Sequence, residues 1–153
     1  MANTYTQIHI QVIIAVKFRD AIILPSWKER MHQYITGIVQ NNNHKMLCIN
    51  SMTDHLHLFF GFRPTQSLAD LMMLVKGESS EWINKQKFTP AKFRWQEGYG
   101  AFSYARSQVK TVAAYVENQE IHHRKKTFLN EYEDFLRKFE IEYDQKYIFK
   151  PLE

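Results

Sequence analysis

The chain has 153 residues, of which 44% are hydrophobic and 14% are aromatic. This length and composition predict one domain with a substantial apolar core and exclude a disordered chain. The formal charge of +4 is uneven, because residues 131–153 carry seven acids and four bases while the first 130 residues carry a surplus of seven positive charges, which suits a polyanionic partner.

The single cysteine, Cys48, excludes an intrachain disulfide framework and fits a reducing cytoplasm. The N-terminus has no basic region followed by an apolar stretch, and no run approaches the roughly 18 apolar residues of a membrane span. We therefore expect a cytoplasmic protein with no membrane partner, and a single domain over residues 1–153.

The first half of the chain predicts strand, helix and two further strands. Residues 5–17 alternate between two faces, which is typical of a strand. Ser26 and Glu29 have the spacing of a capping box, and predict a helix that closes at three consecutive asparagines. A second strand is expected over about 45–52, and a turn leads from it into a strand that begins at His55.

The second half predicts helix, strand and two helices. Ser67 and Asp70 mark the start of a helix, and residues 93–104 predict a fourth strand that is interrupted near its glycines. Residues 128–146 predict an amphipathic helix that packs on the body or on a second subunit. Between them, a helix is predicted by apolar residues at three- and four-residue spacing, namely Val109, Val112, Ala113 and Val116.

This order of elements predicts an α+β fold. It is that of a ferredoxin-like (RRM-like) antiparallel sheet with packed helices, βαββαβ-α plus a C-terminal helix. The first and third strands are neighbours at the centre of such a sheet. His9 or Gln11 then approaches His55 and His57 if they share a face, but solvent-facing polar residues on a half-exposed strand are an equal alternative. Neither is therefore included in the predicted catalytic set.

The segment Asp54-His55-Leu56-His57-Leu58-Phe59-Phe60 contains a candidate metal site. A strand has a side-chain period of two, so both imidazoles point to one face while the residues between and after them point to the core. Two neutral imidazoles about 6 to 7 Å apart along a strand can share one divalent cation. Histidine also has ordinary hydrogen-bonding uses, so the pair alone leaves both interpretations open.

Tyr115 and Gln119 lie one turn apart at the margin of the apolar stripe of their predicted helix. The two side chains are therefore offered together to a neighbouring site, and the amide oxygen can act as a third metal ligand. The alternative is a boundary tyrosine that packs its ring and exposes its hydroxyl.

These motifs resemble those of a known family. His55-Leu56-His57 resembles the paired-histidine motif of HUH endonucleases, and residues 115–119 resemble the nucleophile helix of their single-tyrosine transposases, which serve small bacterial insertion sequences. Thr53 departs from the pattern, because many relatives have proline before the Asp-His pair. The resemblance covers nearly the whole chain, through residues 4–7, 95–103, 117–120 and 122–125.

The resemblance implies a metal-dependent transposase of single-stranded DNA that recognises hairpins at transposon ends. Tyr115 is then the nucleophile, which forms a 5′-phosphotyrosine link and leaves a free 3′-hydroxyl. His55, His57 and Gln119 are then the ligands of Mg²⁺ or Mn²⁺. Because excision holds two ends and one suitably placed tyrosine is evident, the resemblance also implies a homodimer, with the tyrosine helix of one subunit against its own histidines or those of the other.

Basic residues are candidates for contacts with the DNA backbone, on the metal-bearing side of the sheet and on exposed helices. Each of them is also explained as an ordinary solvated charge. His122 and His123 are equally ambiguous and are not assigned as ligands. The candidates are Arg63, Lys76, Arg94, Arg106, Lys110, Arg124, Lys125 and Lys126.

Three other functions are considered. A rolling-circle replication initiator or relaxase shares the histidine pair and the tyrosine chemistry, but this short chain has no helicase or oligomerisation domain. A non-catalytic single-stranded DNA or RNA-binding module predicts binding that is indifferent to metal and to Tyr115→Phe. A cupin-type metal enzyme needs a glutamate shortly after its histidine pair, and residues 58–62 supply none.

Overall fold

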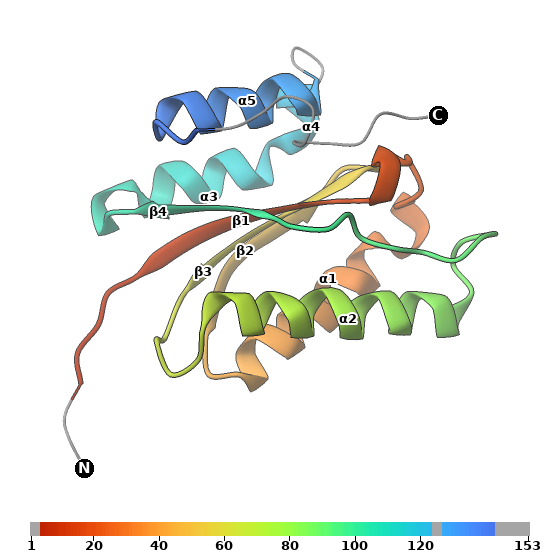
Figure 1. The fold of residues 1–153 in the computed structure, drawn as a ribbon, viewed down its shortest axis with the longest axis horizontal. Coiled ribbons are helices and arrows are strands. Elements are labelled where there is room, and N and C mark those ends of the chain that lie inside the picture. Colours follow the sequence, from red (N-terminus) through yellow and green to blue (C-terminus); the bar gives the residue numbers. More distant parts are fainter. Residues whose placement is uncertain (1–3, 124–126, 143–153) are drawn as a thin grey trace.

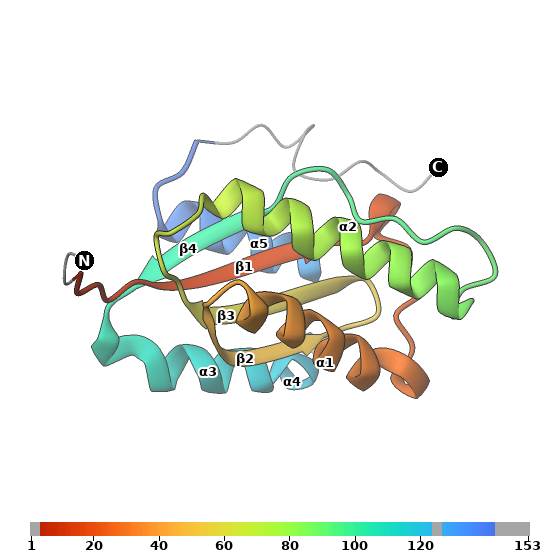
Figure 2. The same cartoon turned by 90° about the horizontal axis from the view of Figure 1, so that it is seen from below.

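A four-stranded antiparallel sheet forms the middle layer of the computed structural model, which describes residues 4–123 and 127–142. The strand order is β2-β3-β1-β4 (Figure 2). The sheet therefore has the ferredoxin-like order, with the first and third strands adjacent at its centre, as the sequence predicted. The strands are β1 (His9–Ala15), β2 (Lys45–Ser51), β3 (His55–Gly61) and β4 (Gly100–Tyr104).

Helices cover both faces of the sheet (Figure 1). One face carries α1 (Pro25–Asn41) and α2 (Leu68–Gln86). Among the described residues, no helix combines the length and apolarity that crossing a membrane requires. The other face carries α3 (Val109–Glu117), α4 (Gln119–His123) and α5 (Phe128–Lys138), and two short 3-10 turns lie at Lys17–Arg19 and Arg106–Gln108.

Strand alternation separates two sets of buried side chains. Leu56, Leu58 and Phe60 of β3 enter the large core beneath α1 and α2, together with the even-numbered residues of β1. Ile13 and Ala15 of β1 point to the opposite face and pack against α5. The sequence predicted this alternation for both strands, and it places the odd-numbered positions of β3 on the face that α3 and α5 cover.

The helix starts show which capping signals the chain uses. Ser67 caps α2, because its Oγ accepts a hydrogen bond from the backbone N–H of Asp70 at 3.0 Å, as predicted. The predicted capping box at Ser26 was wrong. Helix α1 begins at Pro25, so Ser26 lies inside the helix, and the residue before the helix, Leu24, provides no side-chain cap. Proline at the first helical position has the required φ and has no N–H to satisfy, so a capping side chain is not needed there.

The first and the fourth strands were predicted to be longer than they are. β1 spans His9–Ala15 rather than residues 5–17, and only Gly100–Tyr104 of the predicted 93–104 strand joins the sheet. Before Gly100, Trp95 makes one isolated bridge to Val16. Two backbone hydrogen bonds flank this bridge, from Lys17 N–H to the Arg94 carbonyl at 3.0 Å and from Gln96 N–H to the Ala15 carbonyl at 2.8 Å. The Trp95 indole also donates to Ser79 Oγ of α2 at 2.9 Å.

Helix α5 packs on the body of the same chain. Thr127 Oγ1 accepts a hydrogen bond from the Asn130 N–H at 3.2 Å, and the helix ends at Lys138 rather than continuing through the predicted range 128–146, of which residues 143–146 lie outside the described part. The histidine pair is not exposed on its side of the sheet. That side is covered by α3 and α5, and both histidines are fully buried.

Candidate active site

The histidine pair lies in the middle of the covered sheet face. His55 and His57 project from β3 on the side opposite to Leu56, and both have 0% solvent exposure. Their ring centroids are 5.1 Å apart. The i, i+2 spacing therefore produces the predicted pair, which is buried between the sheet and its helices.

An acceptor fixes the outer nitrogen of each imidazole. The Nδ1 of His55 lies 2.7 Å from Asp54 Oδ1, and the Nδ1 of His57 lies 2.8 Å from Gln11 Oε1. Because these oxygens accept from the rings, Nδ1 is the donor, and Nε2 is the nitrogen that faces the site. In many proteins, a hydrogen bond to the ring nitrogen that does not bind the metal orients a metal-binding histidine in this way.

Gln11 belongs to the site, although sequence reasoning left it out. It lies on the central strand β1 beside β3, and its amide nitrogen donates to the Tyr104 hydroxyl at 3.0 Å. The available signal was the predicted adjacency of the first and third strands. His9 lies further along β1, where its ring contacts Phe59 rather than the histidine pair.

Tyr115 and Gln119 come from two helices rather than one. α3 ends at Glu117, Asn118 has non-helical backbone angles, and Gln119 begins α4. The break still leaves the two residues in contact, because Gln119 Nε2 donates to the Tyr115 carbonyl at 3.3 Å. Gln119 Oε1 then lies 3.4 Å from His55 Nε2, which is the side of the ring where a shared ion would bind.

The tyrosine helix is fixed to the edge of the sheet. Val112 and Val116 of α3 pack on Cys48 and Phe59. The side-chain amide of Asn50 on β2 donates to the last two carbonyls of the helix at 3.0 and 3.1 Å. These contacts place the Tyr115 ring with its centroid 6.1 Å from that of His57.

Cys48 lies beneath this helix. Its thiol is 3.7 Å from the Ala113 carbonyl and 3.9 Å from Glu117 Oε1. Burial, and secondarily the Glu117 carboxylate, raise the pKa of the Cys48 thiol to about 11. The residue is therefore a small core side chain, as expected from its apolar surroundings.

Glu131 is a site residue that the sequence reasoning missed. Its Oε1 lies 3.3 Å from His57 Nε2 and 3.7 Å from His55 Nε2, and its other oxygen accepts a hydrogen bond from the Tyr115 hydroxyl. The carboxylate is nearly fully buried. The signal was present in the sequence, because Glu131 lies three residues after Phe128 and four before Phe135, on the apolar stripe of its helix.

The assembled donors fit a divalent cation. Among the described residues, His55, His57 and Glu131 offer ligand atoms that all lie within 4.8 Å of one another. Imidazole nitrogens and carboxylate and amide oxygens together suit Mn²⁺, Zn²⁺ and related ions. The site can therefore hold a metal ion next to a tyrosine hydroxyl.

The phenol of Tyr115 is in its protonated form in this arrangement. Burial is the largest cause that raises its pKa, and the adjacent Glu131 carboxylate raises it further. Attack by this oxygen therefore needs an acceptor for the proton.

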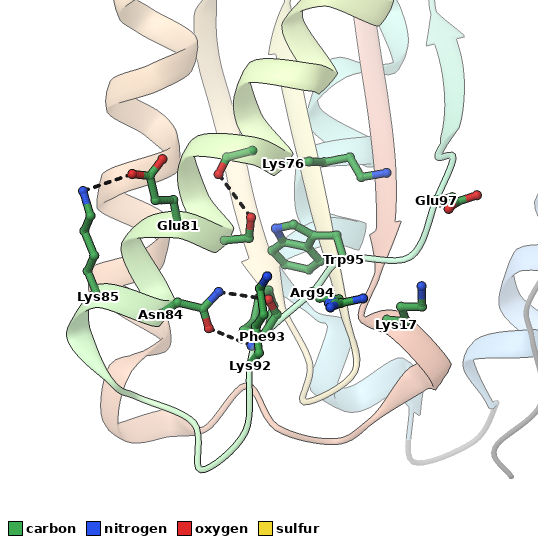
Figure 3. A pocket seen from close by; sticks show the side chains of 12 residues that line it. Lys17, Lys76, Glu81, Asn84, Lys85, Lys92, Phe93, Arg94, Trp95 and Glu97 are labelled. Carbon is green, nitrogen blue, oxygen red and sulfur yellow. Dashed lines mark hydrogen bonds and ion pairs between the residues drawn. The ribbon is translucent and has the colours of Figure 1, made fainter.

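The basic residues predicted to contact DNA lie in several places. Lys76 and Arg94 line a surface pocket of about 810 Å³ together with Lys17 (Figure 3). Lys76 also donates to the carbonyls of Gln96 and Gly98 at 2.7 and 2.9 Å, so it holds that segment in place. The lining of this pocket does not include the histidine pair or Tyr115.

The remaining candidates are outside that pocket. Arg63 and Arg106 line a second pocket of about 920 Å³, and Lys110 is exposed on α3. The cluster at 124–126 lies outside the described residues.

Comparisons with known proteins identify the family of this chain. Residues 4–119 match the model of the family described as "Transposase IS200 like". The chain is 21% identical to the ISDra2 transposase TnpA of Deinococcus radiodurans over 119 residues. The aligned region covers 74% of this chain and 84% of that protein.

Two solved structures share the fold. A transposase from Deinococcus radiodurans R1 superposes with a TM-score of 0.62 at 19% identity, over 78% of this chain and 96% of that one. A REP-associated tyrosine transposase bound to a REP hairpin superposes with a TM-score of 0.61 at 9% identity, over 80% of this chain and 73% of that one. The family match covers most of the chain, and we conclude that this protein belongs to the IS200-like transposase family.

Proposed function

We propose that this transposase cleaves single-stranded DNA at transposon ends marked by hairpins and rejoins it through a 5′-phosphotyrosine intermediate. The main observation behind this proposal is that the Tyr115 hydroxyl hydrogen-bonds to the Glu131 carboxylate, which also faces His55 and His57. A nucleophile, a cation-binding donor set and an oriented histidine pair are thus assembled together. Membership in the family and the hairpin bound to one structural neighbour support the nature of the substrate.

The residues have distinct roles in this proposal. His55 and His57, with Gln119, hold Mg²⁺ or Mn²⁺, which supplies positive charge against the anionic phosphodiester. Tyr115 attacks phosphorus, the bond to the 3′-oxygen breaks, and the 3′-hydroxyl leaves. The phosphotyrosine ester conserves the energy of the broken bond, so the 3′-hydroxyl of another strand reverses the step and joins DNA without ATP.

Removal of the nucleophile is the direct test. Tyr115→Phe is expected to abolish the SDS-resistant protein–DNA adduct formed with labelled single strands from the flanks of the gene. His57→Ala is expected to lower its yield about 10²-fold or more, because the ion no longer stabilises the transition state. Tyr34→Phe is the matched control, since Tyr34 stacks on Trp82 on the opposite layer.

In this assay the control should form the adduct as the unmodified protein does. Binding of the same strands without an adduct, in both Mg²⁺ and Mn²⁺, would instead support a non-catalytic nucleic-acid-binding module.

Metal binding is expected to stabilise the folded protein. At a Mn²⁺ concentration of about 100 times Kd, the free energy of unfolding should rise by about 2.7 kcal/mol, which corresponds to roughly 5–10 °C in Tm for a domain of this size. Thermal unfolding with Mn²⁺ or EDTA measures this shift. It should vanish in His57→Ala and persist in His32→Ala, whose imidazole bonds Ser51 Oγ at 2.8 Å instead. An equal shift in His57→Ala would place the ion elsewhere.

We propose that Arg94 contacts the DNA backbone from the pocket shown in Figure 3. It is exposed, and it lines that pocket with Lys17, Lys76 and Lys92. Arg94→Ala should weaken binding of a hairpin-bearing single strand and reduce the slope of log K against log salt by about 0.7–0.9, the loss of one phosphate contact. Arg30→Ala is the control, because Arg30 lies over the Phe88 ring and is not part of the lining of this pocket. An unchanged slope in Arg94→Ala would remove this residue from the interface.

We propose further that the protein acts as a homodimer, because two DNA ends have to be held together and each chain carries one tyrosine site. In this structure the tyrosine helix lies against the histidines of its own chain. A mixture of Tyr115→Phe and His57→Ala chains is therefore expected to remain inactive in cleavage, while light scattering shows dimers. Recovered cleavage would mean that the subunits exchange their tyrosine helices, and a monomer with and without DNA would contradict the dimer.

A further inference from the structure

Helix α5 brings one carboxylate between the nucleophile and the histidine pair. Glu131 Oε1 is 3.3 Å from His57 Nε2 and 3.7 Å from His55 Nε2, while Oε2 accepts the hydrogen bond of the Tyr115 phenol. The two oxygens of one side chain therefore contact the two halves of the site. Gln119 approaches both halves as well, because its Oε1 lies 3.4 Å from His55 Nε2 and its side chain hydrogen-bonds to Tyr115, but Glu131 is the residue that brings a negative charge to both.

The position of α5 is set by packing that does not involve this carboxylate. The Phe128 ring stacks on the His55 imidazole with centroids 3.8 Å apart and planes 3° apart. Phe128 and Leu136 join Phe102 of β4 in an apolar cluster. Tyr132 approaches β4 so closely that a Cβ on Gly100 would lie 2.5 Å from its hydroxyl. The helix is thus docked by its apolar face, and Glu131 is carried into the site.

Burial of this carboxylate has an energetic requirement. Glu131 is 3% exposed, and a carboxylate in such a place is costly unless it accepts hydrogen bonds and lies near positive charge. Tyr115 supplies one hydrogen bond. The Nε2 atoms of the two histidines face the carboxylate, because their Nδ1 atoms are held by Asp54 and Gln11. A divalent cation bound at these Nε2 atoms would place positive charge beside the carboxylate.

The distances fit such an ion better than they fit hydrogen bonds. An octahedral ion with ligands at about 2.1 Å separates neighbouring ligand atoms by about 3 Å. The oxygens of Glu131 and Gln119 lie 3.3 to 3.7 Å from the histidine nitrogens, and a separation of 3.7 Å is too long for a hydrogen bond. The ligand atoms of His55, His57 and Glu131 all lie within 4.8 Å of one another, which is a span that one ion can bridge.

We propose that Glu131 is a catalytic residue, which completes the metal site through Oε1 and orients the Tyr115 phenol and receives its proton through Oε2. This inference rests on the proposed function and deepens it. As the Tyr115 oxygen bonds to phosphorus, its proton passes to Oε2 and the bond from phosphorus to the 3′-oxygen breaks. The 3′-oxygen takes up one proton from water. During strand joining the attacking 3′-hydroxyl loses its proton to water, and Oε2 returns its proton to the Tyr115 oxygen.

The same contact has a competing explanation with the opposite sign. If Glu131 only occupies the place of the DNA phosphate, α5 is an inhibitory plug, and removal of the carboxylate speeds the reaction. A ligand and proton acceptor predicts the reverse, because its removal weakens metal binding and slows the reaction. The two explanations are therefore separated by one substitution.

Glu131→Gln keeps the shape of the side chain and removes its charge. Titration of Mn²⁺ without DNA, followed by electron paramagnetic resonance of the free ion, should show at least about 10-fold weaker binding. Glu133→Gln, the matched change on the same helix, should alter the affinity less than 2-fold. Tyr115→Phe should also leave it within about 3-fold, which separates the metal contact from the hydrogen bond.

The rate of adduct formation gives the second measurement. It should fall about 10²- to 10⁴-fold in Glu131→Gln, the usual contribution of a proton acceptor, and stay unchanged in Glu133→Gln. Unchanged Mn²⁺ affinity overturns the proposal. A faster adduct also overturns it and identifies α5 as a plug. If the unmodified protein forms no adduct but Glu131→Gln still loses Mn²⁺, the proposed function fails while the metal contact stands.

Crystals of the unmodified protein with Mn²⁺ provide a test that does not depend on a folded variant. An anomalous peak within about 2.4 Å of Glu131 Oε1 supports the proposal. A peak held by the histidines and Gln119 alone, with Glu131 turned away, overturns it.

Discussion

Two imidazoles at full burial in the centre of a sheet face impose the main constraint on this molecule. Each ring nitrogen has to meet a polar group, because an unsatisfied buried polar atom costs about 1–3 kcal/mol. Asp54 and Gln11 satisfy the outer nitrogens, and they come from the turn before β3 and from its central neighbour β1. The order of the strands thus determines which residue can orient His57, and the orientation determines which nitrogen faces Glu131.

The parts of the fold that follow from local periodicity could be predicted from the sequence. The alternation of β1 and β3, the Ser67 cap and the apolar stripe of α3 each depend on residues close together in the chain. The predicted bounds were wrong where contacts between residues far apart in the chain determine the ends of an element. Before β4, Trp95 makes one isolated bridge to Val16, and its indole meets Ser79 of α2. The break at Asn118 also separates helices that periodicity alone joins.

The site could likewise be predicted only in part from the sequence. The His55–His57 pair, Tyr115 and Gln119 are recognisable from spacing and family resemblance, and the structure brings all four together. Gln11 and Glu131 are not, because each reaches the site from an element whose position depends on the complete fold. Glu131 is also the first of seven acids in residues 131–153. It was therefore counted with the acidic C-terminal segment, although it lies on the apolar stripe of its helix. An acid on an apolar stripe is better interpreted as the partner of another buried polar group, here the histidine pair and the Tyr115 hydroxyl.

The single thiol under the tyrosine helix has a practical consequence. Because Cys48 lies between β2 and α3, and its pKa is raised to about 11, reagents that attack thiolates meet very little of their target while the helix is seated. The rate at which such a reagent labels the native protein therefore measures how often α3 lifts from the sheet. The chain carries one cysteine, so the signal has a single origin, and it reports on the mobility of the nucleophile without any engineered probe.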